Sequence, residues 1–132
     1  ISSGAAGGPR EQLTTAFAVI EAYEDVLTQQ FLTGLEAMDD YQLVGLGRRH
    51  LERPEYQGRR VSTFSIRHRT KTSQQLAEAL GRRGMFAWNG NYYALELSEQ
   101  LGYEPEGMLR IGFVHYNTVE EVSRLLQALK EI

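Results

Sequence analysis

The chain contains no cysteine among its 132 residues. This absence excludes a disulfide framework, a thiolate metal site and a cysteine nucleophile within the chain, and it fits a cytoplasmic protein. No apolar run approaches the roughly 20 residues that a membrane-spanning helix needs, so we expect no membrane partner. The formal net charge of −3 leaves no excess of basic residues, which argues against nucleic acid as a partner.

What is present describes a soluble globular domain. Hydrophobic residues make up 42% and charged residues 23% of the chain, and the length fits one domain with an ordinary core. The opening stretch "ISSGAAGGP" has neither an initiator Met nor the basic and apolar regions of a signal peptide. Its small residues predict a flexible linker over residues 1–8. We interpret it as the remnant of a linker that follows a missing domain, with an expression-tag remnant or a processed terminus as the alternative.

Hydrophobic periodicity predicts the elements that follow. A helix of about 28 residues should start at Pro9, where the missing N–H is harmless, and end near Met38. Apolar segments bounded by turn residues predict strands at "YQLVGL", "RVSTFSI" and "MFAW" and over residues 109–114. The charged, turn-rich segment 47–60 predicts a loop whose arginines are solvated. The apolar side of the long helix comprises Leu13, Ala16, Phe17, Ile20, Tyr23, Leu27, Phe31 and Leu35.

Two capping boxes predict further helices. Thr72 with Gln75 should open one helix that closes before Gly84, and Thr118 with Glu121 should open the last. Between them, "NGN" predicts a turn, "YYALELSEQLG" a short helix closed by Gly102, and "EPEG" another turn. This order of elements predicts an α+β fold: a mainly antiparallel four-stranded sheet with helices packed on one face. The apolar positions of the two capped helices are Leu76, Ala79 and Leu80, then Val122, Leu125, Leu126 and Leu129.

The last predicted strand carries one arginine. Alternation places Leu109, Ile111 and Phe113 on one face and Arg110, Gly112 and Val114 on the other. A guanidinium offers a rigid fork that matches a carboxylate in two parallel hydrogen bonds, and a glycine two residues along leaves room for a ligand. The alternative is an arginine paired with a nearby glutamate at the sheet surface.

The segment "WNGNYYALEL" concentrates aromatic residues at a tight turn. Such a segment is either a lid or pocket wall, or a hairpin corner whose aromatic rings plug the edge of the core. Other catalytic patterns are missing. The three histidines are not spaced as metal ligands, the GxSxG signature is absent, and "GRRG" lacks the lysine and hydroxyl of a phosphate loop. We therefore expect no catalytic residue and no metal site within this chain.

The stretches "GMFAWNGNYYALEL" and "MLRIGFVHYNTVEEVSRLLQAL" resemble the C-terminal small domain of fold-type I, class V aminotransferases. The similarity points to the cysteine-desulfurase-like and isopenicillin-epimerase-like branch. That domain typically ends with an arginine-led strand, a Tyr-Asn-Thr corner and an acidic helix start. Here those features are Arg110, residues 116–118 and the pair Glu120 and Glu121. The resemblance extends from Pro9 onward and is most specific from Gly84 to Leu129.

This resemblance implies that residues 9–132 belong to a pyridoxal-phosphate (PLP) enzyme acting on a small amino acid, as a transferase or a lyase. A large domain outside this chain would hold the cofactor through a lysine and an aspartate, so the chain alone should be inactive. The resemblance further implies that Arg110 grips the substrate α-carboxylate, that Asn91, Tyr92 and Tyr93 line the active-site mouth, and that the whole enzyme is a homodimer.

One departure limits the resemblance. In true desulfurases, the loop after the Gly84 region carries a cysteine that accepts sulfur as a persulfide. Aligning Gly84 and Gly90 with that motif places Trp88 where an arginine usually stands and Tyr93 where the cysteine would be. A phenol cannot form a persulfide, so we do not expect desulfuration by that route.

Two other hypotheses predict different behaviour. A stand-alone α+β amino-acid-sensing module would bind an amino acid as an isolated chain. A purely structural dimerisation domain would lose no activity when Arg110 or Tyr93 is replaced.

Overall fold

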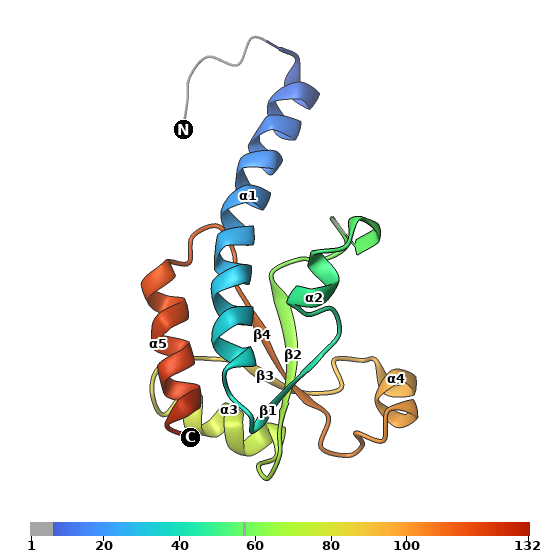
Figure 1. Cartoon of the computed structure of the whole chain (residues 1–132), viewed down its shortest axis with the longest axis vertical. Coiled ribbons are helices and arrows are strands. Elements are labelled where there is room, and N and C mark those ends of the chain that lie inside the picture. The colour runs from blue at the N-terminus through green and yellow to red at the C-terminus, as the bar shows by residue number, and fades with distance from the viewer. Residues whose placement is uncertain (1–6, 57) are drawn as a thin grey trace.

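A computed structural model describes residues 7–56 and 58–132, so most of the predicted linker 1–8 lies outside the described residues. The chain forms an α+β domain around a four-stranded sheet of order β1-β2-β4-β3 (Figure 1). Every neighbouring pair is antiparallel, which confirms the predicted fold class. The elements are α1 (Pro9–Glu36), β1 (Tyr41–Val44), α2 (Arg48–Leu51), the 3-10 turn η1 (Pro54–Tyr56), β2 (Thr63–His68), α3 (Ser73–Gly81), β3 (Trp88–Gly90), α4 (Leu95–Gln100), β4 (Met108–Gly112) and α5 (Val119–Lys130).

The 28-residue helix α1 has the predicted length, but only its second half is packed. Leu27 and Phe31 are fully buried, whereas Leu13 and Phe17 are each 59% exposed on the same side of the helix. The first half extends beyond the rest of the domain (Figure 1). The apolar stripe is therefore continuous in sequence but is covered by this domain only from about Leu27 onward.

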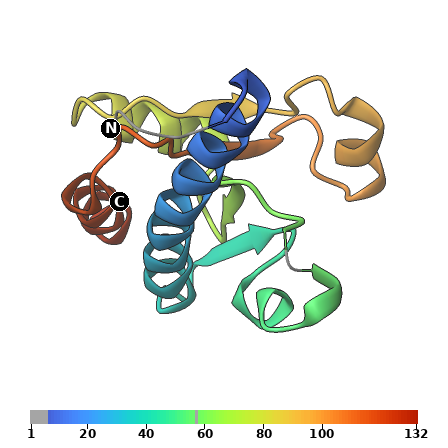
Figure 2. The ribbon, with the colours of Figure 1, turned by 90° about the horizontal axis from the view of Figure 1, so that it is seen from above.

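The core lies between the sheet and the helices α1, α3 and α5. At its centre, the ring of Phe31 from α1 lies 4.4 Å from that of Phe64 on β2 and 5.4 Å from that of Phe113, between centroids. Fully burying a phenylalanine contributes about 1.5–3 kcal/mol, so these three rings anchor the helix layer to the sheet. In Figure 2 the short helices α2 and α4 lie on the side away from α5.

Both predicted capping boxes form. The Thr72 hydroxyl accepts from the Gln75 N–H at 3.2 Å at the start of α3, and the Gln75 side chain accepts from the Thr72 N–H at 2.9 Å. At the start of α5, the Glu121 carboxylate accepts from the Asn117 side chain at 3.1 Å and from the Thr118 N–H at 3.0 Å. These two hydrogen bonds lower the pKa of Glu121.

The prediction of a plain loop over 47–60 is wrong in part, because two short helical turns form there. The N–H of Gly47 donates to Nδ1 of His50 at 3.1 Å, which closes the first turn. Arg48 pairs with Glu36 of α1 at 3.4 Å. Arg60, expected on a solvated surface, is half-buried: its guanidinium lies 4.3 Å over the Phe64 ring and donates to the carbonyls of Leu46 and Thr63.

The third strand also differs from its prediction. Pairing with β4 begins at Trp88 and continues through Gly90, so the strand is displaced from "MFAW" into the predicted turn. At the end of this strand two backbone segments approach closely: a Cβ on Gly107 would stand 2.6 Å from the Cα of Gly90, and closer still to its carbonyl. Gly107 has φ +61°, a conformation that favours glycine.

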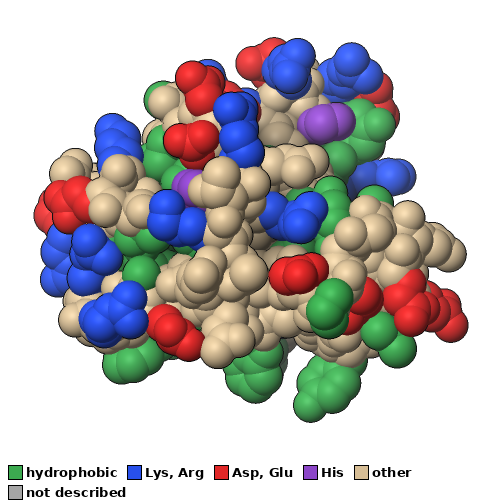
Figure 3. Space-filling model, turned by 90° about the horizontal axis from the view of Figure 1, so that it is seen from below, with side chains coloured by type: hydrophobic (Ala, Val, Ile, Leu, Met, Phe, Trp, Pro, Cys, Tyr) green, Lys and Arg blue, Asp and Glu red, His purple; other side chains and the backbone are tan. Residues whose placement is uncertain are grey.

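On the face shown in Figure 3, basic and acidic side chains are interspersed, so no large patch of one charge forms there. Apolar side chains protrude along the lower edge of this view. Within residues 7–56 and 58–132, none of the helices has the length and apolar character needed to cross a membrane.

Candidate functional site

Arg110 lies in the middle of the sheet, on the face that α1, α3 and α5 leave open. It stands opposite Ser65 of β2 and Trp88 of β3, and its side chain is exposed. The side chains of β4 alternate between the two faces of the sheet as predicted, since the neighbours of Arg110, Leu109 and Ile111, lie in the core and are 0% and 5% exposed. The pleat of β4 therefore holds the guanidinium outward, with its base fixed by two flanking strands.

The open face has room beside Arg110. Gly112 lies two residues along the same face, and a Cβ there would meet nothing closer than the Thr63 hydroxyl at 3.6 Å. The face is therefore uncrowded at Gly112, whereas the Tyr92 ring lies beside the guanidinium itself. The prediction that this glycine lets a ligand approach Arg110 stays a prediction.

No acidic side chain pairs with Arg110 in the part of the chain that the structure describes. The ion pairs within 4.0 Å there involve Arg48, Arg69 and Arg83 instead. A surface pairing of Arg110 with a glutamate, the alternative from the sequence, is therefore absent among the described residues. A carboxylate can reach this guanidinium without displacing an internal partner.

Tyr92 forms one wall of the site. The Arg110 guanidinium carbon lies 5.1 Å from the centroid of the Tyr92 ring, within the range of a cation–π contact. The phenol oxygen is shielded from solvent and has no hydrogen-bond partner of good geometry among the described residues. Burial raises the pKa of Tyr92, while Arg110 and the nearby Ser65 hydroxyl lower it by less, so the phenol stays protonated at neutral pH.

The loop that carries Tyr92 is strained. Tyr92 and Tyr93 both adopt left-handed backbone conformations, with φ of 55° and 66°. Such conformations cost about 1–3 kcal/mol each in non-glycine residues and concentrate at functional sites. The Asn91 carboxamide oxygen stabilises the loop by accepting from the Tyr93 N–H at 3.1 Å.

The structure thus separates the three predicted loop residues. Tyr92 lies against Arg110, and the Asn91 side chain closes the turn. Tyr93 is 98% exposed, so its ring projects into solvent away from the body of the domain. Of the three residues, Tyr92 is the one whose ring packs against the arginine.

The sequence pattern did not single out a second arginine on this face. Arg67 of β2 lies on the same face as Ser65, and its guanidinium carbon is 4.0 Å from the centroid of the Tyr103 ring. The predicted strand "RVSTFSI" ended too early, at Ile66. Because every second side chain of a strand lies on the same face, extending the strand by one residue would have placed Arg67 on the face of Thr63 and Ser65.

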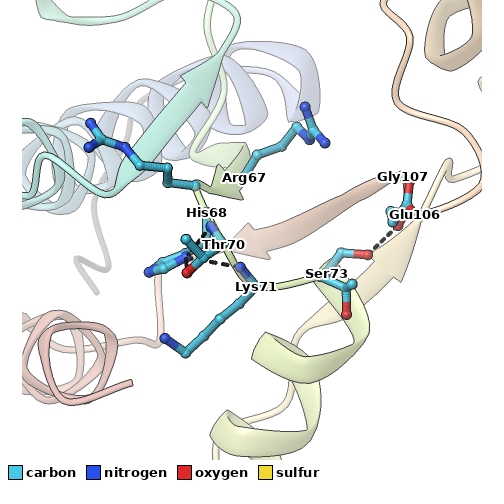
Figure 4. Close-up of a pocket in the computed structure, with 9 residues that line it drawn as sticks. Arg67, His68, Thr70, Lys71, Ser73, Glu106 and Gly107 are labelled. Carbon is cyan, nitrogen blue, oxygen red and sulfur yellow. Dashed lines mark hydrogen bonds between the residues drawn. The ribbon is translucent and has the colours of Figure 1, made fainter.

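A cavity of about 170 Å³, which Arg67 also lines, lies at the corner between β2 and α3 (Figure 4). There, Nδ1 of His68 accepts from the N–H groups of Thr70 and Lys71 at 3.1 and 3.2 Å. Burial and the neighbouring Lys71 charge lower the pKa of His68, which keeps the ring neutral and able to accept. His68 therefore organises a turn. No group of three or more potential metal ligands forms in the described chain.

The fold and the site together define an α+β domain that presents arginine side chains on an open sheet face. The family model of class-V aminotransferases matches residues 12–125. The chain therefore belongs to the class-V aminotransferase family, and the resemblance inferred from the sequence is confirmed.

Individual proteins agree with this assignment. The chain is 34% identical over 76 residues to the aminotransferase-like protein FGM3 of Gibberella zeae, covering 55% of this chain and 19% of that protein. Its fold resembles a cysteine desulfurase from Thermococcus onnurineus NA1, with a TM-score of 0.74 and 23% identity over 92% of this chain and 28% of that one. It also resembles the Escherichia coli cysteine desulfurase CsdA, with a TM-score of 0.67 and 19% identity over 84% of this chain and 24% of that one.

These comparisons establish the fold and the family. The chain spans less than a third of the length of each of these relatives. The match extends over nearly all of the described domain, including β4 and Arg110.

Proposed function

We propose that residues 9–132 are the C-terminal small domain of a PLP-dependent enzyme that acts on an amino acid, and that Arg110 binds the substrate α-carboxylate. The family membership and the small share of each relative that this chain spans support the proposal. The observation that carries it is an outward guanidinium with no acidic partner among the described residues, centred on an open sheet face.

Arg110 contributes orientation. Two parallel hydrogen bonds from a guanidinium fix both the position and the plane of a carboxylate. The strand pairings with Ser65 and Trp88 fix the backbone of the arginine, and the Tyr92 ring restrains its side chain. A substrate held in this way presents a defined bond at its α-carbon to the reacting group, which is the contribution that positioning makes to catalysis.

The cofactor belongs to another part of the protein. The chain has two lysines, Lys71 and Lys130. Lys71 lines the corner cavity, and Lys130 ends α5 on the opposite side of the sheet from Arg110. The open face thus offers anion-binding groups without a lysine, so it fits the substrate's carboxylate and does not fit a cofactor anchor. PLP, when bound, supplies an electron sink for the amino acid's α-carbon.

The loop 91–93 would border the same substrate. Tyr92 supplies a neutral phenol beside Arg110, with a buried oxygen that still lacks a partner among the described residues. Tyr93 and Asn91 lie on the same turn, with Tyr93 fully accessible to another domain. The chain has no cysteine, and the sequence alignment above matches Tyr93 with the persulfide-forming cysteine of desulfurases. We therefore propose a reaction other than persulfide-based desulfuration.

The first half of α1 provides a docking surface for the cofactor domain. Leu13 and Phe17 continue the apolar stripe that Leu27 and Phe31 bury inside this domain. An apolar surface that continues a packed core outward is typical of an interdomain contact. We propose that the large domain covers this stripe and that the complete enzyme is a cytoplasmic homodimer.

The test uses the full-length enzyme. Arg110→Ala should weaken the apparent binding of the amino-acid substrate by about 2–5 kcal/mol, the cost of removing one side of a charge-assisted pair, while the visible absorbance of the bound cofactor is retained. Arg82→Ala, on an exposed arginine after α3, is the control and should change neither quantity. Unchanged kinetics in Arg110→Ala would contradict the proposal. Amino-acid binding by the isolated 132-residue chain in calorimetry would favour a sensing module.

A further inference from the structure

The open sheet face carries two arginines where a monocarboxylate needs one. Ser65 of β2 is the direct partner of Arg110, and Arg67 lies two residues further along the same strand and the same face. Arg67 and Arg110 are therefore diagonal neighbours across the two central strands, a relation that places their α-carbons about 7–8 Å apart. Two cations on one sheet face, neither of them paired with an acidic side chain among the described residues, favour the binding of an anion there.

Both guanidinium groups are held in the same manner. Arg67 stacks on Tyr103 at 4.0 Å and Arg110 on Tyr92 at 5.1 Å, between the guanidinium carbon and the ring centroid. Stacking uses one flat face of each guanidinium and leaves the N–H groups at its edge available. Among the described residues, neither arginine has an acidic side chain within 4.0 Å. Glu106, which lines the corner cavity with Arg67, forms no such pair.

The two tyrosines come from one segment. Tyr92 and Tyr103 both belong to the connection between β3 and β4, which also contains α4. Met108 points to the open face yet is only 3% exposed, so part of that face is covered. Figure 4 shows Arg67 extending away from His68 and Lys71, and so away from the corner turn. The rings that contact the two arginines therefore come from one connection of the chain.

We propose that Arg67 is a specificity residue that binds a second carboxylate, on the side chain of the substrate, so that the enzyme prefers dicarboxylic amino acids. This inference rests on the proposed function of Arg110 in binding the α-carboxylate. Two separated forks with their N–H edges available match two carboxylates of one small molecule. A single carboxylate would leave one of the two arginines without an anion.

The experiment compares acidic substrates with their neutral isosteres in the full-length enzyme. Aspartate, glutamate, asparagine and glutamine are assayed for kcat/KM with the wild type, Arg67→Gln and Arg67→Lys. The wild type should prefer one acid over its amide by about tenfold or more, the scale of a charge-assisted hydrogen bond. Arg67→Gln should abolish this preference by lowering kcat/KM for the acid much more than for the amide. Arg67→Lys should restore part of it.

The outcomes separate the two proposals. If Arg67→Gln lowers kcat/KM equally for acids and amides, Arg67 is structural or contacts another domain, and the inference is overturned. The inference is also overturned if the wild-type enzyme prefers neither acid over its amide. It is overturned, too, if inorganic phosphate inhibits the enzyme competitively and Arg67→Gln alone removes this inhibition, because Arg67 would then bind a phosphate group. If Arg110→Gln also leaves every substrate unaffected, the proposed function fails together with the inference. If Arg110→Gln weakens all substrates and Arg67→Gln weakens none, only the inference fails.

Discussion

Replacing Gly107 with alanine should displace the loop that borders the candidate site. The left-handed φ of +61° at this position costs an L-residue about 1–2 kcal/mol. The new Cβ would also stand 2.6 Å from the Cα of Gly90. Backbone atoms cannot rotate aside as a side chain can, so β3 and β4 must separate. Overpacking of this kind costs typically about 1–3 kcal/mol. Together, the two effects predict a loss of about 2–5 kcal/mol in the free energy of unfolding.

Gly102→Ala is the matched control. Gly102 has a similar φ of +68°, but a Cβ there would meet nothing within 4 Å. It should therefore show only the conformational cost of about 1–2 kcal/mol. Both variants are measured by urea unfolding of the 132-residue chain. The chain's single tryptophan, Trp88, lies in β3 two residues before Gly90, so its emission should shift in Gly107→Ala alone. Equal losses in the two variants, with unchanged emission in both, would refute the argument from the close backbone approach.

Two further measurements test the fold. The lowered pKa of Glu121 implies stability that is present above its ordinary pKa of 4.5 and is lost as the pH falls through the folded-state pKa. Glu121→Gln should therefore flatten this acid-side loss in urea unfolding at a series of pH values, whereas Glu120→Gln should leave it in place. Phe31→Ala should cost about 3–5 kcal/mol because the ring is fully buried, while Phe17→Ala, on the same side of α1 but 59% exposed, should change the isolated chain by less than about 0.5 kcal/mol.

The parts of the fold that depend on local chemistry could be predicted from the sequence. The capping boxes at Thr72 and Thr118 need only residues three apart, and each forms as predicted. The two faces of β4 follow from alternation alone, so the order of residues in that strand is enough to predict the outward position of Arg110.

The errors arise where distant residues decide the outcome. The turn at Arg48 is stabilised by Glu36 of α1, twelve residues away. The position of β3 is defined by its pairing with β4, and Gly107 approaches Gly90 at the end of that strand; no pattern within "MFAW" records either contact. The contact of Arg67 with Tyr103 joins residues 36 positions apart in the chain, and it exists only because the β3–β4 connection returns over the sheet.

Under the proposed function, the exposed residues around Arg110 predict that this face works only when another domain covers it. Trp88, the strand partner of Arg110, is 62% exposed, and Tyr93, next to Tyr92 in the loop, is 98% exposed. Water weakens a guanidinium–carboxylate pair in such an open position. A surface that buries these aromatic side chains would also exclude water from Arg110 and Arg67, and each hydrogen bond to an anion would become stronger in the lower dielectric. Domain docking and substrate binding would then stabilise each other through the same residues. Under the proposed function, this surface would close over a substrate that the cofactor domain holds.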